Sequence, residues 1–417
     1  MCDPRGVTYN LNQQRLKTAM SSTKTSVSLL AILGALMAMT SIAIDIYLPA
    51  MPVMEEKLGG DAELAITGFL LGFAIAQLLW GPISDRVGRK IPLFIGMVLF
   101  IIGSISCALS TNMTEVVLWR IFQAIGACVG PILSRAMIRD MYGATKAAQT
   151  MSTLMMIMAV APIAGPFVGG GLLAVGTWQL IFWAMAIVGV MMFAALFFLP
   201  ETLPKETRAP QSFLHTFGNY GNLLKNGRYM RYTLCVTAFY VAVYAFVSGS
   251  PSVYITHFGI PEQYFGLFFG INILGVTMVS ALNRRLLRTY TLDVLIRRSL
   301  AVAVTAAIIL AALSFTGIGG LWGVVAPMFF IFSTNGIIAT CTNAAALSSV
   351  PTRMTGAAAA LLGSLQYGSG VVSSALLALL SDGTPRAMSG IIAVVIVLSA
   401  LSMIGAPHKP HKQNVET

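Results

Sequence analysis

The sequence predicts an all-α membrane protein in which twelve transmembrane helices form two six-helix halves. Of its 417 residues, 56% are hydrophobic and only 10% are charged, and the mean hydropathy is +0.80. Soluble domains are about 45–50% apolar. Apolar runs of about 20 residues, long enough to cross a hydrocarbon core about 30 Å thick, recur along almost the whole chain. Lipid offers no partners to backbone polar groups, so these runs must be helices.

Six of the expected spans lie on either side of one long polar interval, and duplicated halves with a cavity between them are a common plan for secondary transporters. The twelve spans cover residues 27–49, 64–82, 91–110, 115–137, 149–173, 178–199, 232–254, 264–283, 299–316, 321–346, 357–380 and 387–406. The predicted parts are a cytoplasmic N-terminal segment (1–26), an N-terminal six-helix half (27–199), a cytoplasmic linker (200–231), a C-terminal six-helix half (232–406) and a cytoplasmic tail (407–417).

The cations are distributed unevenly between the two sides of this topology. If the N-terminus is cytoplasmic, 23 of the 26 Lys and Arg residues fall in cytoplasmic segments. The opposite side keeps Lys57 and Arg386, and Arg120 lies inside the fourth span. Cytoplasmic loops carry the excess of cations, which predicts that both termini are cytoplasmic. The net charge of +11 therefore reflects topology and anionic lipid headgroups, and gives no support to nucleic-acid binding.

The loop GPISDRVGRK, from Gly81 to Lys90, joins the second and third spans. A basic loop that only sets topology would explain its cations but not its spacing. The stretch resembles the signature of the major facilitator superfamily, G-x-L-S/A-D-R/K-x-G-R/K-R/K, with Ile83 at the usual Leu. The resemblance implies that the loop latches the two halves together in one conformation, with a helix N-terminus as a partner for the carboxylate. The implied gating residues are Gly81, Asp85, Arg86, Gly88, Arg89 and Lys90.

The fourth span contains LWRIFQAIGA, with a single arginine inside the membrane. A charge there costs about 2.5–3.5 kcal/mol on insertion scales, so it usually faces a cavity or a partner. The alternative is that Arg120, close to the outer end, reaches the interface. The pattern of Arg120, Gln123 and Gly126 resembles the superfamily's R-x-x-Q-G-x-G, with Ala124 in place of the first Gly.

The fifth span contains MMIMAVAPIAGPFVGGGL, in which Gly165, Pro166, Gly169 and Gly170 form G-P-x-x-G-G. By itself this is a packing motif, because proline removes backbone donors and glycine lets another helix approach closely. It is similar to the antiporter motif of drug-efflux members of the superfamily, and this similarity implies export rather than uptake.

Asp45, in SIAIDIYLPAMP, is the one acid within the body of a predicted span; the other fourteen lie in loops, tails or helix ends. Desolvation disfavours the charged form of a carboxylate, which would let Asp45 take and release protons near neutral pH. The alternative is an interfacial acid close to Pro49. D-I-Y-L-P-A-M-P resembles the D-x-Y-L-P-x-x-P opening of the bicyclomycin/chloramphenicol-resistance branch of drug:proton antiporters, as does PETLP after the sixth span. We therefore expect Asp45 and Arg120 to couple transport to protons.

A largely apolar pocket with a few hydrogen-bonding groups suits amphipathic drugs. Polar and aromatic residues within spans are candidates for this pocket, although most such residues serve helix packing. They are Tyr47, Gln77, Phe122, Gln123, Tyr240, Tyr244, Asn272, Asn335, Asn343, Gln366 and Tyr367.

The sequence thus predicts a proton-coupled multidrug antiporter of the bacterial cytoplasmic (inner) membrane, which acts as a monomer on small drug-like molecules, with a proton gradient and no cofactor. Two alternatives are an uptake symporter of a small metabolite, which would share the fold, and a non-transporting receptor or scaffold. No H-E-x-x-H motif or paired carboxylates indicate an enzyme, and no G-x-x-x-x-G-K-S/T loop indicates an ATP-driven pump. The five cysteines include no CxxC pair, so no metal site is predicted.

Overall fold

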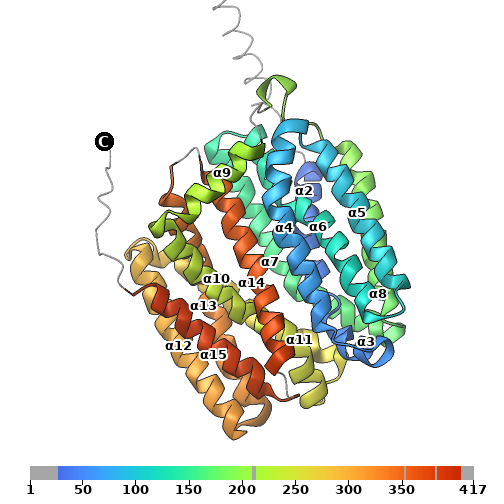
Figure 1. Cartoon of the computed structure of the whole chain (residues 1–417), viewed down its shortest axis with the longest axis vertical. Coiled ribbons are helices and arrows are strands. Elements are labelled where there is room, and N and C mark those ends of the chain that lie inside the picture. The colour runs from blue at the N-terminus through green and yellow to red at the C-terminus, as the bar shows by residue number, and fades with distance from the viewer. Residues whose placement is uncertain (1–26, 209–212, 352–353, 381–382, 405–417) are drawn as a thin grey trace, which may run out of the picture.

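The computed structural model describes residues 27–208, 213–351, 354–380 and 383–404, and within these ranges every regular element is a helix (Figure 1). The elements in chain order are α2 (Val27–Asp45), η1 (Leu48–Ala50), α3 (Met51–Leu58), α4 (Glu63–Val87), α5 (Lys90–Leu109), α6 (Met113–Met141), α7 (Ala144–Val175), α8 (Gln179–Ala195), η2 (Leu196–Phe198), η3 (Lys205–Thr207), α9 (Phe213–Leu224), α10 (Gly227–Pro251), η4 (Ser252–His257), α11 (Glu262–Leu286), α12 (Leu292–Thr316), α13 (Gly320–Ser348), α14 (Thr355–Leu380) and α15 (Pro385–Ser402).

Twelve helical segments of the described residues are long and apolar enough to cross a membrane, which confirms the predicted all-α fold with twelve spans. Their ends differ from the expected ones by several residues, because helices continue past the apolar core into charged sequence. The fourth segment, for example, runs from Met113 to Met141 rather than over 115–137. The predicted terminal segments, 1–26 and 407–417, lie outside the described residues.

The first membrane segment is broken, where the sequence predicted one continuous span over 27–49. Helix α2 ends at Asp45, and the short helices η1 and α3 continue the segment to Leu58. Pro49 and Pro52 lie in the first turns of η1 and α3, where a backbone N–H needs no helical partner. Asp45 therefore occupies a helix terminus inside the membrane segment, and it is 6% exposed.

The helices pack as two groups, one for each half of the chain, and the groups contact each other mainly through two pairs of helices. In the first half α6 packs against α4 and α5, α5 against α8, and α2 against α7; in the second half α10 packs against α14 and α15, and α13 against α11 and α12. The halves meet where α4 packs on α14 and where α7 packs on α11 (Figure 1). Across the first pair, the Ser364 hydroxyl donates to the Ala74 carbonyl oxygen at 2.8 Å.

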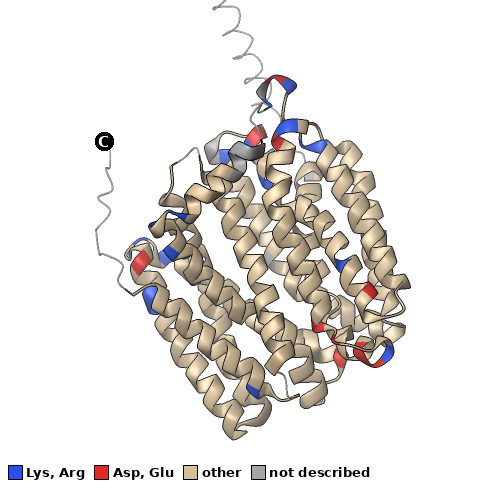
Figure 2. Cartoon of the chain, in the orientation of Figure 1, with Lys and Arg blue, Asp and Glu red and all other residues tan. Residues whose placement is uncertain are grey.

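Charged residues lie mostly towards the two ends of the bundle and are sparse along its middle (Figure 2). Exposed side chains along the helices include Met191 on α8 and Ile308 on α12. Such a surface suits lipid and is disfavoured in water. Cations gather at the end that carries α9 and the turn between α4 and α5.

The linker between the halves contains a helix that the sequence reading did not identify. In the expected polar linker, α9 runs from Phe213 to Leu224, and α10 begins at Gly227, before the predicted span. The Tyr220 side chain is buried, and its hydroxyl donates to the Leu78 carbonyl oxygen of α4 at 3.1 Å. Helix α9 thus packs on α10 and α14 of the second half and is bonded to α4 of the first half through Tyr220.

Candidate functional site: a pathway through the bundle

Arg120 on α6 is completely buried within the first half. Its guanidinium lies between two aromatic rings, with the central carbon 4.3 Å from the ring centroid of Tyr47 and 4.4 Å from that of Phe69. Nη1 donates to the carbonyl oxygen of Ala43 at 2.9 Å and to Oε1 of Gln123 at 2.7 Å. Aromatic faces and oxygen acceptors both stabilise a desolvated cation. The side chain therefore points into the bundle, and the alternative that it reaches the interface is wrong.

Arg120 also caps the C-terminal end of α2, the helix that carries Asp45. The Ala43 carbonyl belongs to the last turn of α2, where carbonyl groups lack helical partners and the helix dipole favours a cation. Asp45 is the last residue of that helix, yet the guanidinium makes no salt bridge to it among the described residues. Arg120 thus hydrogen-bonds the backbone beside the acid and acts on the carboxylate through its charge alone.

Hydrogen-bonding groups remain unused around this arginine. Nε and Nη2 of Arg120 and the Tyr47 hydroxyl are buried without a partner. Gln123 is engaged on both sides, because its Nε2 also donates to the Ser104 hydroxyl at 2.7 Å. Buried polar groups are nearly always paired. These unpaired groups therefore indicate a place where a hydrogen-bonding partner binds in one state of the protein and is absent in another.

The G-P-x-x-G-G motif of α7 packs directly on the break in the first membrane segment. A Cβ added at Gly165 would lie 3.0 Å from the Asp45 Cβ, and one added at Gly169 would overlap the Ile46 carbonyl oxygen. A Cβ at Gly170 would lie 2.9 Å from the Glu262 carbonyl oxygen of α11 in the other half. The glycines thus let α7 contact both the acid-bearing segment and the second half.

Four aromatic side chains form a cluster between the halves, where α4 faces α10 and α14. The ring of Phe73 lies 4.0 Å from that of Tyr367, which lies 6.4 Å from Tyr244, and Tyr240 follows at 6.1 Å from Tyr244. Asp45 interacts electrostatically with Tyr244 and Tyr367. The structure therefore brings three of the candidate substrate residues together, two of them within electrostatic range of the acid.

The remaining candidates fall into two groups. Gln366 donates to Oδ1 of Asn343 at 3.2 Å, and the side-chain carbonyl oxygens of Asn272 and Asn335 are buried without a partner. Phe122 is 46% exposed and contacts Trp119. Phe122 lies two positions after Arg120, which places it on the opposite side of α6. We therefore correct its expected role, because it faces away from the interior.

The loop between α4 and α5 forms a network around Arg89, which is 6% exposed. Its Nη1 donates to Asp85 at 2.6 Å and to the Ser84 hydroxyl at 2.7 Å, and its Nε donates to Asp140 of α6 at 2.8 Å. Burial lowers the pKa of Arg89, but the two carboxylates outweigh it and raise the pKa above its ordinary value. Asp85 pairs within its own loop rather than with a helix N-terminus, the partner expected from the sequence.

Glu201, from the PETLP stretch after the sixth span, closes the same network. Its carboxylate accepts the backbone N–H groups of Arg89 at 2.9 Å and of Lys90 at 3.1 Å. Burial raises the pKa of Glu201, but these bonds and the N–H of Leu203 outweigh it and lower the pKa. Gly88 has a φ of +97°, and a Cβ there would lie 2.6 Å from Oε2 of Glu201, so the turn requires glycine.

Sequence reasoning missed Asp140 and Glu201 as members of this network. The sequence did show two acids near the expected ends of spans: Asp140 directly follows Arg139 in the last turn of α6, and Glu201 follows Pro200. Neither position fixes its partner, since the contacts join segments 51 and 112 residues apart. Within the described ranges, no group of three or more His, Cys, Asp or Glu residues could hold a metal ion.

Comparisons with known proteins agree with this geometry. The profile of the Major Facilitator Superfamily matches residues 31–375. The chain is 34% identical over 397 residues to the uncharacterized MFS-type transporter YdgK of Bacillus subtilis, covering 94% of this chain and 98% of that protein. It is 28% identical over 390 residues to a bicyclomycin resistance protein homolog of Haemophilus influenzae, covering 92% and 97%.

Solved structures of the same fold include a variant of the nucleoside transporter NupG, with a TM-score of 0.73 at 14% identity over 90% of this chain and 98% of that one. This likeness extends the match to the full arrangement of helices. The protein is therefore a multi-pass membrane transporter and not an enzyme, and the chain belongs to the major facilitator superfamily.

Proposed function

We propose that this chain is a proton-coupled antiporter that exports amphipathic, drug-like molecules across the bacterial cytoplasmic membrane by alternating access. The observation that carries the proposal is the buried carboxylate of Asp45, placed at a helix terminus within a membrane segment. An intramembrane acid is costly and usually functional. The drug-resistance name of the Haemophilus influenzae relative supports export of drugs.

In the proposed cycle Asp45 binds a proton while the site is open to the outside and releases it to the cytoplasm. The unpartnered Nε and Nη2 of Arg120 are available to the ionised carboxylate. Protonation removes that partner, so the contact between α6 and the end of α2 changes with the charge of Asp45. A proton thereby biases the two conformations differently, as coupling requires.

The loop from Gly81 to Lys90 is proposed to stabilise one of these conformations. Its network joins α4, α6 and the start of the linker through Arg89, Asp140 and Glu201. Breaking it would change the equilibrium between the two conformations, because these residues lie at the end of the bundle rather than among the buried aromatic rings.

The orientation and assembly are also proposed: both termini cytoplasmic, as the distribution of cations predicts, and a monomer in the lipid bilayer as the transporting unit. Reporter fusions at each terminus test the orientation. An alkaline phosphatase fusion should be inactive at both ends, and activity at either end would contradict it.

The central test uses cells that lack their own drug exporters and express this chain. We expect reduced susceptibility to several amphipathic antibiotics, and, in everted vesicles, proton movement when an exported compound is added. Accumulation of a compound in intact cells instead of extrusion would identify an uptake symporter. A receptor or scaffold would show neither transport nor a difference between the parent and Asp45→Asn.

A further inference from the structure

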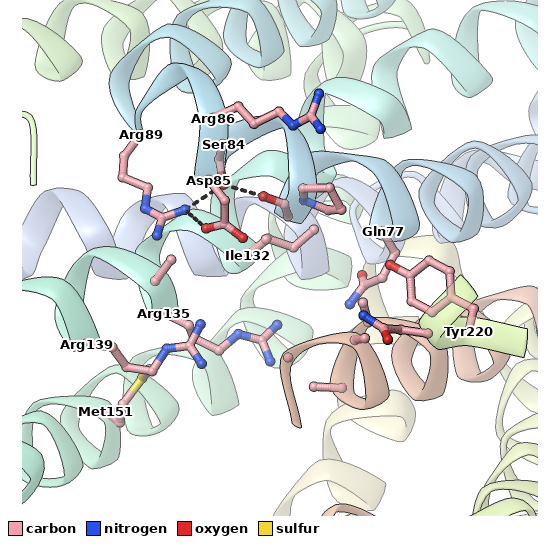
Figure 3. A pocket seen from close by; sticks show the side chains of 18 residues that line it. Gln77, Ser84, Asp85, Arg86, Arg89, Ile132, Arg135, Arg139, Met151 and Tyr220 are labelled. Carbon is pink, nitrogen blue, oxygen red and sulfur yellow. Dashed lines mark hydrogen bonds and ion pairs between the residues drawn. The ribbon is translucent and has the colours of Figure 1, made fainter. Parts of the chain in front are cut away.

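A cavity of about 390 Å³ lies at the cation-rich end of the bundle, between α4, α6, α9 and α14 (Figure 3). Four arginines line it, Arg86, Arg89, Arg135 and Arg139, and one acid, Asp85. Asp85 and Asp140 already engage Arg89. The described part of the cavity therefore carries an excess of positive charge.

The excess is concentrated on α6. Arg135 and Arg139 are four residues apart, so their side chains share one helix face, and they repel each other electrostatically. Neither has a carboxylate partner within the described residues. The Nε of Arg135 donates to the Pro131 carbonyl oxygen at 2.8 Å, which fixes the guanidinium and leaves its two terminal amino groups for a ligand.

A topogenic role explains the exposed Arg139 but not the position of Arg135. The positive-inside rule needs cations in cytoplasmic loops, where water solvates them. Arg135 lies on a membrane helix, is only partly exposed, and lines a cavity. Arg139 is exposed, but Arg135 is a partly desolvated cation without a carboxylate partner among the described residues, and an anion bound beside it would stabilise it.

Arg135 links the cavity electrostatically to the aromatic cluster. Arg135 interacts electrostatically with the Tyr367 phenol, and Tyr367 packs on Phe73. Gln77, which also lines the cavity, would lie 2.5 Å from a Cβ at Gly363, so the two halves are in close contact beside it. The aromatic cluster, within electrostatic range of Arg135, offers a surface suited to the apolar part of a bound molecule.

We propose that this cavity is a binding site for amphipathic organic anions, in which Arg135 and Arg139 bind the acidic group of the transported molecule. The planar guanidinium binds carboxylate, sulfonate or phosphate through paired hydrogen bonds. This inference rests on the proposed function in one respect, namely that the bound anion is the molecule that the protein transports. It narrows the substrate class from drug-like molecules in general to those with an acidic group.

The test compares two fluorescent probes that differ only in charge, dansylglycine and its neutral amide, dansylglycinamide. Both are titrated into the purified full-length protein in detergent, without a proton gradient. We expect dansylglycine to bind at least about tenfold more tightly, because a guanidinium makes stronger hydrogen bonds to a carboxylate than to a neutral amide. Arg135→Gln should remove this preference while dansylglycinamide binding stays unchanged, and Arg135→Lys should keep part of it.

Equal affinities for the two probes, or a preference that survives Arg135→Gln together with Arg139→Gln, would overturn the proposal. An anionic lipid could supply the same chemistry, so thermal unfolding is also measured with phosphatidylglycerol and with phosphatidylcholine. Stabilisation by phosphatidylglycerol that depends on Arg135, without any preference for dansylglycine, would assign the cavity to lipid and overturn it. Binding is measured at equilibrium and does not require proton movement. If the protein prefers dansylglycine but moves no protons in vesicles, the antiport mechanism is contradicted and the anion-binding site still stands.

Discussion

The guanidinium of Arg120 bonds to the carbonyl oxygen of Ala43, two residues before Asp45, and not to the Asp45 carboxylate. In this conformation the arginine therefore holds the end of α2 through its backbone and leaves the carboxylate without a hydrogen bond from the guanidinium. Positioning of the helix terminus and proton binding thus depend on different groups here, the Ala43 carbonyl and the Asp45 carboxylate. This arrangement leads to different expectations for changes at the two residues.

Replacing Asp45 by Asn should abolish transport driven by a pH gradient while the protein still inserts and folds, because the amide keeps size and polarity but cannot bind and release a proton. Substrate-dependent proton movement in everted vesicles measures this. Asp61→Asn is the matched control, since Asp61 is an exposed acid in the turn before α4. Transport by Asp45→Asn that still responds to the pH gradient would remove Asp45 as the proton carrier.

Replacing Arg120 by Lys should lower transport by about tenfold or more, because an ammonium lacks the planar fork that reaches Ala43 and Gln123 from between two rings. The variant should also unfold at a lower temperature in detergent. Arg386→Lys, at an exposed position in the first turn of α15, should match the parent in both measurements. Parental transport by Arg120→Lys would mean that positive charge alone suffices there.

Replacing Gly169 by Ala should impair folding or transport, because the added methyl group would overlap the Ile46 carbonyl oxygen. Overpacking of this kind costs about 1–3 kcal/mol. Gly171→Ala is the matched control, since a Cβ at Gly171 has no neighbour within 4 Å. Thermal unfolding and transport are measured for both, and equal behaviour of the two would show that the motif does not need close packing at Gly169.

Replacing Asp85 by Asn should shift the balance between inward-open and outward-open states by roughly 5- to 150-fold, the range expected for a latch of about 1–3 kcal/mol. Turnover should slow, and cysteines introduced along the pathway should change in accessibility. Because Asp85 lines the proposed anion-binding cavity, affinity is measured with the neutral probe dansylglycinamide, and in one trapped state it should stay near that of the parent. Unaltered accessibility with normal turnover would leave the loop as a determinant of topology only.

Replacing Glu201 by Gln should destabilise the same conformation at neutral pH, because the carboxylate accepts backbone N–H groups from Arg89, Lys90 and Leu203. These bonds lower the pKa of Glu201 below its ordinary value of 4.5, so their contribution is fully present above pH 4.5 and is lost as the pH falls through the lowered pKa. The difference in unfolding temperature between parent and variant should be constant above pH 4.5 and shrink below it. A difference that instead grew on acidification would contradict this assignment.

The fold was predictable because the membrane restricts a chain of this composition to helices, and twelve apolar runs are visible without any tertiary information. Residue types such as Asp45 and Arg120 stood out for the same reason, since charge within an apolar run is rare. The break after Asp45, the helix α9 and the partners of Arg89 were not predictable, because they depend on contacts between distant segments. Phe122 was misplaced because residue type does not reveal which helix face points inward.

The linker has a mechanical consequence for any rocking of the halves. Tyr220 fastens α9 to α4, and only Lys225 and Asn226 separate α9 from α10. The side chain of Asn226 also donates to the Ser349 carbonyl oxygen at the end of α13. Helix α9 also packs on α10 and α14 of the second half, so the Tyr220 bond joins the two halves at this end of the bundle, and any motion that separates them there must break this bond.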